Sequence, residues 1–248
     1  MYTVASINRF FYNKVNTVKS PLKSKNGEYQ NPRISVNSLC EYNFASPTRR
    51  NSIINNSKEK PVFIAARYND VEDVLSFYLA NIRNDPKVLA NQIHALITSK
   101  FRTEFEQKCA LLSADALSSF LSYEHLVYKA LSVYSPKMSI EETKNKMLIN
   151  GVQISIRPEI KLYDSSLRQQ LGFIKFYICK SIPLTQERGE LIACLGKYYF
   201  ESEEHLQLMS KNCLVLDVFR GTIISAPKSY IKRIADVKAS CQEIADRW

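Results

Sequence analysis

Apolar residues recur every three to four positions through much of the first 150 residues of the chain. Over residues 61–134 this spacing predicts three helices, the second of which begins at Asp85, directly before a proline. A shorter helix is expected to begin after Ser35, followed by a polar loop over residues 51–60. Residues 139–148 are predicted to form one more short, polar helix. This part of the chain is therefore expected to be mainly helical.

The apolar period changes from about 3.6 to 2 near residue 150, which is the alternation of a half-buried β-strand. Val152, Ile154 and Ile156 alternate with polar residues, and an apolar alternation resumes beyond Pro158. Residues 171–179 are rich in β-branched and aromatic side chains, which is typical of a central strand. The remaining predicted elements are a helix over about 186–200, a hairpin over 213–225 and a final helix over about 228–248.

This order of elements indicates an α+β fold, close to α/β, with a mixed β-sheet core flanked by helices. We expect residues 1–33 to form a basic, partly ordered arm. Residues 34–248 are expected to form one domain, mainly helical over 34–148 and built of strands and helices over 149–248.

The charge of the chain is unevenly distributed. Lysine and arginine number 34 against 24 aspartate and glutamate, a net charge of +10. Residues 1–60 hold ten basic and three acidic residues, so they contribute +7 of this total. Such a segment is attracted to phosphate backbones, which predicts contact with nucleic acid; a solvated tail, a lipid-binding segment and an organelle-targeting segment are the alternatives.

Several classes of protein are disfavoured by composition. Six cysteines are scattered without a CxxC pair and only three histidines are present, which argues against zinc sites and a disulfide scaffold. No apolar run approaches the roughly 20 residues that cross a bilayer, and no secretory signal is recognisable, so we expect a cytoplasmic protein without a membrane span. Neither a P-loop nor a serine hydrolase motif occurs.

One group of residues stands out in the second half of the chain. Glu159 follows Pro158 where one predicted strand passes into the next, and Lys175 lies on the following strand, before a helix and a hairpin. This order resembles the PD-(D/E)XK nucleases, particularly their RecB-like and Cas4-like branch, over about residues 34–248. The resemblance implies a restriction-endonuclease-like fold, Mg²⁺ as cofactor and DNA as the nucleic acid.

The resemblance also implies roles for individual residues. Glu159 takes the place of the acidic residue that binds Mg²⁺, and Lys175 that of the lysine that helps to position the attacking water. Residues 173 and 175 share one face of a strand, but position 173 is Phe where the family has Asp or Glu. A second carboxylate must then come from elsewhere. We assign Asp164 to this catalytic and metal-binding role, with Glu190 and Glu124 as alternatives.

Five other charged residues are candidates for a functional or a structural role. Arg49, Arg50 and Arg157 are candidates for contact with nucleic acid. Lys175, inside an apolar strand, either extends to solvent or belongs to a site, because burying an unpaired lysine is costly. Asp217, inside another apolar strand, is expected to be exposed at a sheet edge.

Two functions follow as hypotheses. The first is a Mg²⁺-dependent DNA nuclease, in anti-phage defence or a mobile element. The second is an inactive protein of the same fold, which binds nucleic acid or a protein partner as a subunit of a larger complex.

Overall fold

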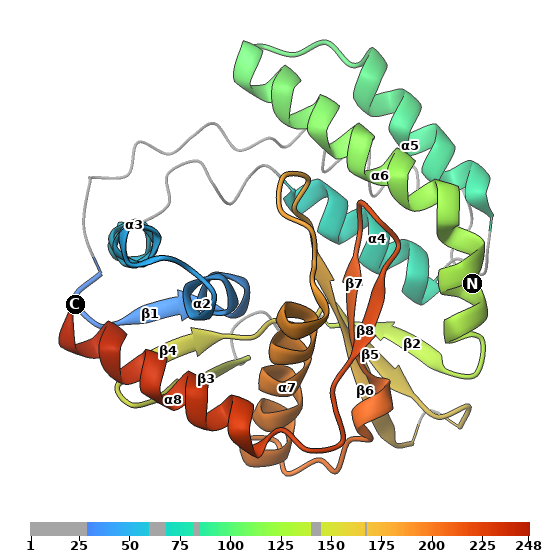
Figure 1. The fold of residues 1–248 in the computed structure, drawn as a ribbon. Helices are drawn as coiled ribbons and strands as arrows, with labels where there is room; N and C mark the ends of the chain where they lie inside the picture. The colour runs from blue at the N-terminus through green and yellow to red at the C-terminus, as the bar shows by residue number, and fades with distance from the viewer. Residues whose placement is uncertain (1–28, 60–67, 82–84, 140–144, 167) are drawn as a thin grey trace.

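The computed structural model describes residues 29–59, 68–81, 85–139, 145–166 and 168–248. At its centre is a five-stranded mixed sheet in the order β2-β5-β6-β7-β8 (Figure 1). Strands β6 and β7 are parallel, and the other neighbours are antiparallel. The strands are β2 (Ser135–Met138), β5 (Ile160–Tyr163), β6 (Gln170–Tyr177), β7 (Cys213–Asp217) and β8 (Ile223–Ser225). The predicted α+β class is confirmed.

A second, three-stranded sheet has the order β1-β4-β3, with bounds Arg33–Ser35, Val152–Ser155 and Lys146–Ile149. Strands β3 and β4 form a hairpin through Asn150 and Gly151, both with positive φ, at 44° and 77°. Such a two-residue turn matches the twist of the flanking strands. The predicted helix over 139–148 is therefore wrong for Lys146 onward, while residues 140–144 lie outside the described residues.

The two apolar patterns that flank Pro158 belong to different sheets. Strand β4 ends at Ser155 in the smaller sheet, and β5 begins at Ile160 in the larger one. The chain therefore crosses between the sheets at residues 156–159. Glu159, the candidate metal ligand, lies at this crossing.

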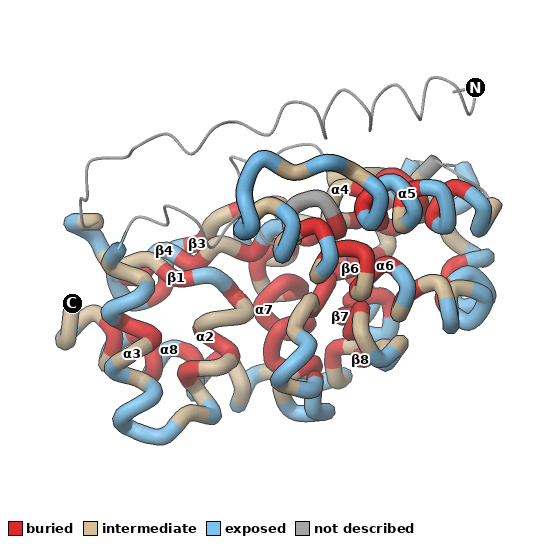
Figure 2. Tube along the Cα trace, turned by 90° about the horizontal axis from the view of Figure 1, so that it is seen from above, coloured by how far each residue is buried: buried red, intermediate tan, exposed pale blue. Residues whose placement is uncertain are grey.

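Helices cover both faces of the five-stranded sheet (Figure 1). Ile174 and Phe176 of β6 belong to an apolar cluster with the helices α4 to α6, while Phe173 and Tyr177 join a cluster with α7 on the other face. The helical bounds are α4 (Asn69–Asn81), α5 (Pro86–Thr98), α6 (Glu104–Leu131) and α7 (Gln186–Ser202). The central strand is thus enclosed on both sides, and Figure 2 shows it as buried.

The smaller sheet lies among three further helices, α2 (Val36–Asn43), α3 (Pro47–Lys58) and α8 (Ile231–Asp246). Ser35 caps α2 as predicted, by accepting a hydrogen bond from the backbone N–H of Ser38. Helix α3 occupies most of the predicted polar loop over 51–60. Its start is specified by Ser46, which accepts from the N–H of Arg49, and by Pro47 in the first turn.

The strands β6 and β7 are joined through α7 and a short 3₁₀ turn, η2 (Ser210–Asn212). Most of the predicted basic arm, residues 1–28, lies outside the described residues. None of the helices in the described ranges is both long and apolar enough to cross a membrane.

Candidate functional site

The candidate site lies where the chain enters the five-stranded sheet. Arg157 has a φ of 41°, in the left-handed region, and Pro158 behind it is buried. This turn directs the carbonyl oxygen of Arg157 to Lys175, whose Nζ donates to it at 3.0 Å. A strained backbone conformation and a buried lysine thus occur together at one end of β5 and β6.

Glu159 is held by two donors from β6. One carboxylate oxygen forms an ion pair with Lys175 Nζ, and the other accepts from the backbone N–H of Phe176 at 2.6 Å. The N–H of Glu159 itself donates to Ile174 O, so Ile174 and Phe176 both direct their backbone groups toward β5. The Glu159 carboxylate, directly before the start of β5, therefore accepts the hydrogen bond of the Phe176 backbone N–H of β6.

Both side chains are enclosed. The exposed fraction is 9% for the Lys175 side chain and 8% for that of Glu159. Lys175 therefore does not extend to solvent, and that interpretation is wrong; its membership of a site stays a prediction. The polar partners offset the large cost of placing two charges in the protein interior.

The carboxyl group of Glu159 has a strongly altered pKa. Its pKa is raised from 4.5 to about 7. Burial is the main cause and the negative charge of Glu72 adds to it, while the charge of Lys175 and the hydrogen bonds from Lys175 and Phe176 lower the pKa. A carboxyl group with a pKa near neutrality, beside a specific charge partner, is a feature that clusters at functional sites.

Glu72 is the residue that the sequence reasoning missed. It lies on α4, which packs against β2 and β5, and its charge reaches the Glu159 carboxylate. No sequence motif marks this residue. Only the packing of α4 on the sheet places it on the side of β5. The candidate site thus consists of the Glu159–Lys175 pair, with the negative charge of Glu72 acting on it.

Asp164, the predicted second ligand, does not join them. It follows the far end of β5, where its carboxylate accepts from Ser166 Oγ at 2.7 Å and from the N–H groups of Arg168 and Gln169. These bonds, led by that from Ser166, lower its pKa. Asp164 lies five positions beyond Glu159 along an extended strand, or roughly 16 Å away at about 3.3 Å per residue. The two carboxylates therefore cannot share one metal ion, and the assignment of Asp164 is corrected here.

The two alternative carboxylates also have other partners. Glu190 forms an ion pair with Arg233 and accepts from Gln186, and Glu124 accepts from Tyr78 Oη at 2.8 Å. Within the described residues, no group of three or more His, Cys, Asp or Glu side chains is arranged to hold a metal ion. A metal at this site would rest on two protein carboxylates.

Phe173, in the family's acidic position, is a core residue. It is 1% exposed, its ring centroid lies 5.4 Å from that of Phe200, and it packs on Gly196 of α7. A Cβ at position 196 would lie only 2.3 Å from Phe173 Cζ. The space that an acidic side chain would need is filled by an aromatic ring and a matching glycine.

The candidate nucleic-acid contacts are placed differently from one another. Arg49 pairs with Glu41 at 2.8 Å, and Arg50 pairs with Glu243 of α8 at 3.0 Å. These arginines therefore help to hold α3 against its neighbours. Arg157 is exposed and adjoins the Glu159–Lys175 pair.

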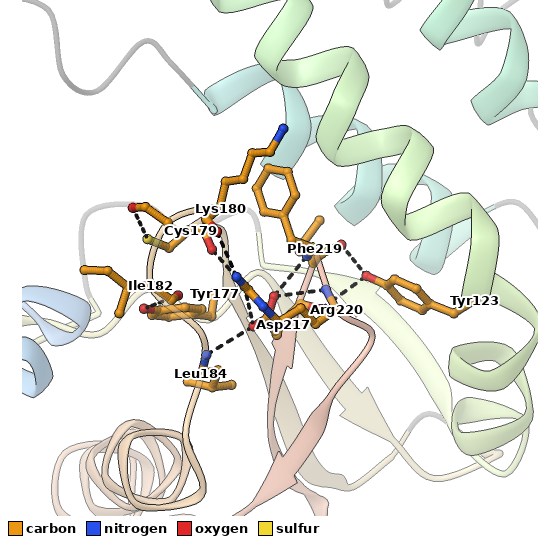
Figure 3. Close-up of polar contacts among 11 residues, drawn as sticks. Tyr123, Tyr177, Cys179, Lys180, Ile182, Leu184, Asp217, Phe219 and Arg220 are labelled. Atoms are coloured by element: carbon orange, nitrogen blue, oxygen red, sulfur yellow. Dashed lines mark hydrogen bonds and ion pairs between the residues drawn. The ribbon is translucent and has the colours of Figure 1, made fainter.

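Asp217 is a second buried carboxylate, at the end of β7 (Figure 3). It accepts from the N–H groups of Leu184, Phe219 and Arg220 and pairs with the Arg220 guanidinium at 3.3 Å. Arg220 also donates to the carbonyls of Cys179 and Lys180. The expected edge exposure of Asp217 is wrong, since its exposed fraction is zero. It links the β7–β8 turn to the loop after β6.

Comparison with known proteins adds no family to this picture. Neither the family models nor the curated proteins searched contain a match to the sequence.

Proposed function

We propose that this protein is a divalent-metal-dependent nuclease whose site consists of Glu72, Glu159 and Lys175. The observation that carries the proposal is that the charge of Glu72 reaches the Glu159 carboxylate, which is itself in contact with Lys175. The three residues come from helix α4, from the turn directly before β5 and from strand β6. The resemblance of the sequence to PD-(D/E)XK nucleases supports the same function.

The donor set fits Mg²⁺. This ion is held by one or two carboxylates, keeps several waters and takes oxygen ligands from substrate phosphates. Glu72 and Glu159 would hold it, and when bound it would supply an activated water and charge neutralisation at a phosphate. No histidine or cysteine is needed for such a site.

Lys175 supplies the positive charge next to the two carboxylates. Its Nζ has three N–H donors, of which Glu159 and the Arg157 carbonyl accept two. An ammonium group so placed binds a phosphate oxygen as a point charge. The net charge of +10 favours the approach of a polyanionic substrate.

The test is cleavage of end-labelled single- and double-stranded DNA with Mg²⁺ or Mn²⁺, with EDTA as the metal-free condition. We expect Glu72→Gln, Glu159→Gln and Lys175→Met each to reduce the rate by about 100-fold or more, as loss of one group that stabilises developing charge does. Glu190→Gln is the matched control, because Glu190 is another ion-paired carboxylate, on α7. The rate of cleavage by this variant should lie within about twofold of the wild-type rate.

Wild-type protein that leaves DNA and RNA intact under all these conditions would contradict the nuclease proposal. Metal-dependent cleavage that survives all three substitutions would contradict the assignment of the site. Circular dichroism spectra of each variant establish that a lost activity does not reflect a lost fold.

A second candidate function has a specific observation in its favour. Position 173 is a buried Phe, and both oxygens of Glu159 already have protein donors. A protein that binds nucleic acid, or a protein partner in a larger complex, without cleaving would have these features. It would bind DNA in a salt-dependent manner, and the three substitutions would leave that binding unchanged.

A further inference from the structure

We propose that Lys175 closes Glu159 to metal ions until nucleic acid draws the lysine away, so that metal and nucleic acid bind cooperatively. This inference rests on the proposed nuclease function and concerns how its site is regulated. Its starting point is the occupancy of the Glu159 carboxylate, in which one oxygen is paired with an ammonium group and the other with a backbone N–H.

A divalent cation and the Lys175 ammonium compete for one carboxylate. They repel each other, and both side chains of the pair are at least nine-tenths enclosed, so water does little to weaken this repulsion. Metal binding to the free protein must therefore displace Lys175 or tolerate its charge. Either requirement lowers the affinity of the free protein for metal.

A nucleic-acid phosphate offers Lys175 another partner. Charge-assisted hydrogen bonds from an ammonium to a phosphate are strong, and Nζ already donates to the backbone carbonyl of Arg157, a residue at the surface. When Lys175 contacts a phosphate, the Glu159 carboxylate gains a free oxygen. Nucleic acid then raises the affinity for metal, and by linkage metal raises the affinity for nucleic acid by the same factor.

The chain contains a matched lysine for comparison. Lys197 of α7 is also 9% exposed and pairs with a glutamate, Glu201, but that glutamate lies one helical turn away on the same helix. Its ammonium also lies 5.2 Å from the centroid of the Tyr230 ring. Substituting Lys197 removes a buried, paired lysine without touching the proposed site.

The experiment measures Mn²⁺ affinity of the full chain from the electron paramagnetic resonance signal of free Mn²⁺. It is run with and without a cleavage-resistant phosphorothioate single strand of about 20 nucleotides, longer than the roughly 4–16 nucleotides of common single-strand sites. We expect DNA to tighten Mn²⁺ binding by wild-type protein by about tenfold, within the usual range of coupling. Lys175→Met should bind Mn²⁺ about tenfold more tightly than wild type without DNA, and DNA should add nothing further.

Lys197→Met should behave as wild type. Equal Mn²⁺ affinities of wild type and Lys175→Met, with no effect of DNA on either, would overturn the inference. If Lys175→Met fails to fold, the effect of DNA on the Mn²⁺ affinity of the wild type still tests the inference. Absence of that effect overturns the proposed coupling.

Glu159→Gln separates this inference from the proposed function. If Mn²⁺ binding requires Glu159 but is independent of DNA and of Lys175, the coupling is wrong while the proposed metal site stands. If wild type and Glu159→Gln bind Mn²⁺ equally, or neither binds it, both the metal site and the coupling are wrong.

Discussion

The two buried lysines of this protein are equally enclosed but differently paired. Each side chain is 9% exposed and each forms an ion pair with a glutamate. Lys197 pairs with Glu201 within one helix, and Glu201 is 26% exposed. Lys175 of β6 pairs with Glu159, which directly precedes β5 and is 8% exposed.

The surroundings of the two glutamates also differ. Glu201 accepts an additional hydrogen bond from Tyr230 Oη and has contact with water. Glu159 is enclosed and lies in the negative field of Glu72, and burial raises its pKa to about 7. The comparison shows that burial of a lysine alone does not mark a site. Enclosure of the partner glutamate and a second negative charge near it are the features on which the proposed site rests.

The largest expected difference between the two pairs is in stability. Glu159→Ala should lower the free energy of unfolding by about 3–5 kcal/mol, because it leaves Lys175 buried without its counter-ion and removes the acceptor of the Phe176 N–H. Glu201→Ala should cost about 1–2 kcal/mol, since water replaces a partly exposed partner. Urea denaturation followed by circular dichroism measures both. Equal losses would show that the two pairs are energetically alike.

The pH dependence of stability should also distinguish Glu159. Its pKa is raised from 4.5 to about 7 on folding, so the folded protein binds more protons than the unfolded chain between these values. The stability that this group contributes is present below pH 4.5 and is lost as the pH rises through 7.

We therefore expect the unfolding free energy of wild type, minus that of Glu159→Gln, to fall by about 1–3 kcal/mol across this window, at about 1.4 kcal/mol per pKa unit. The measurement is urea denaturation of both proteins at several pH values. A difference that rises or stays constant with pH would contradict the assigned direction.

The smallest effect is expected for an exposed pair. Lys180 Nζ lies 2.6 Å from Asp115 Oδ2, but the two side chains are 62% and 41% exposed. A double-mutant cycle with Lys180→Ala and Asp115→Ala should give a coupling of about 0.2–1 kcal/mol, because water and salt screen the interaction. A coupling free energy as large as that of the Glu159–Lys175 pair would show that burial does not set the strength of these ion pairs.

Local patterns predicted most of the elements that form the five-stranded sheet. The apolar run at 171–179 became β6, and the predicted hairpin became β7 and β8. The errors occurred where short-range signals were misjudged. Asn150 and Gly151 specify a hairpin that turns a predicted helix into β3, and Ser46 with Pro47 begins a helix in a predicted loop.

The site was predicted only in part. The positions of Glu159 and Lys175 on successive elements were sufficient to suggest that they meet, because neighbouring antiparallel strands bring such residues together. Asp164 was misassigned, since it follows the end of β5 whereas Glu159 precedes its start. Glu72 was not foreseen, because no sequence spacing relates a helix to the strand on which it packs.

The sequence by itself determined the alternation of helices and strands, the positive charge and the presence of a lysine inside an apolar strand. These are local properties, set by periodicity, capping and composition. Only the tertiary structure decided that Lys175 is paired rather than exposed, that Asp217 is buried and that the charge of Glu72 acts on the Glu159 carboxylate. Each of these depends on how elements distant in the chain pack, and burial together with charge partners is what sets the chemistry of an ionisable group.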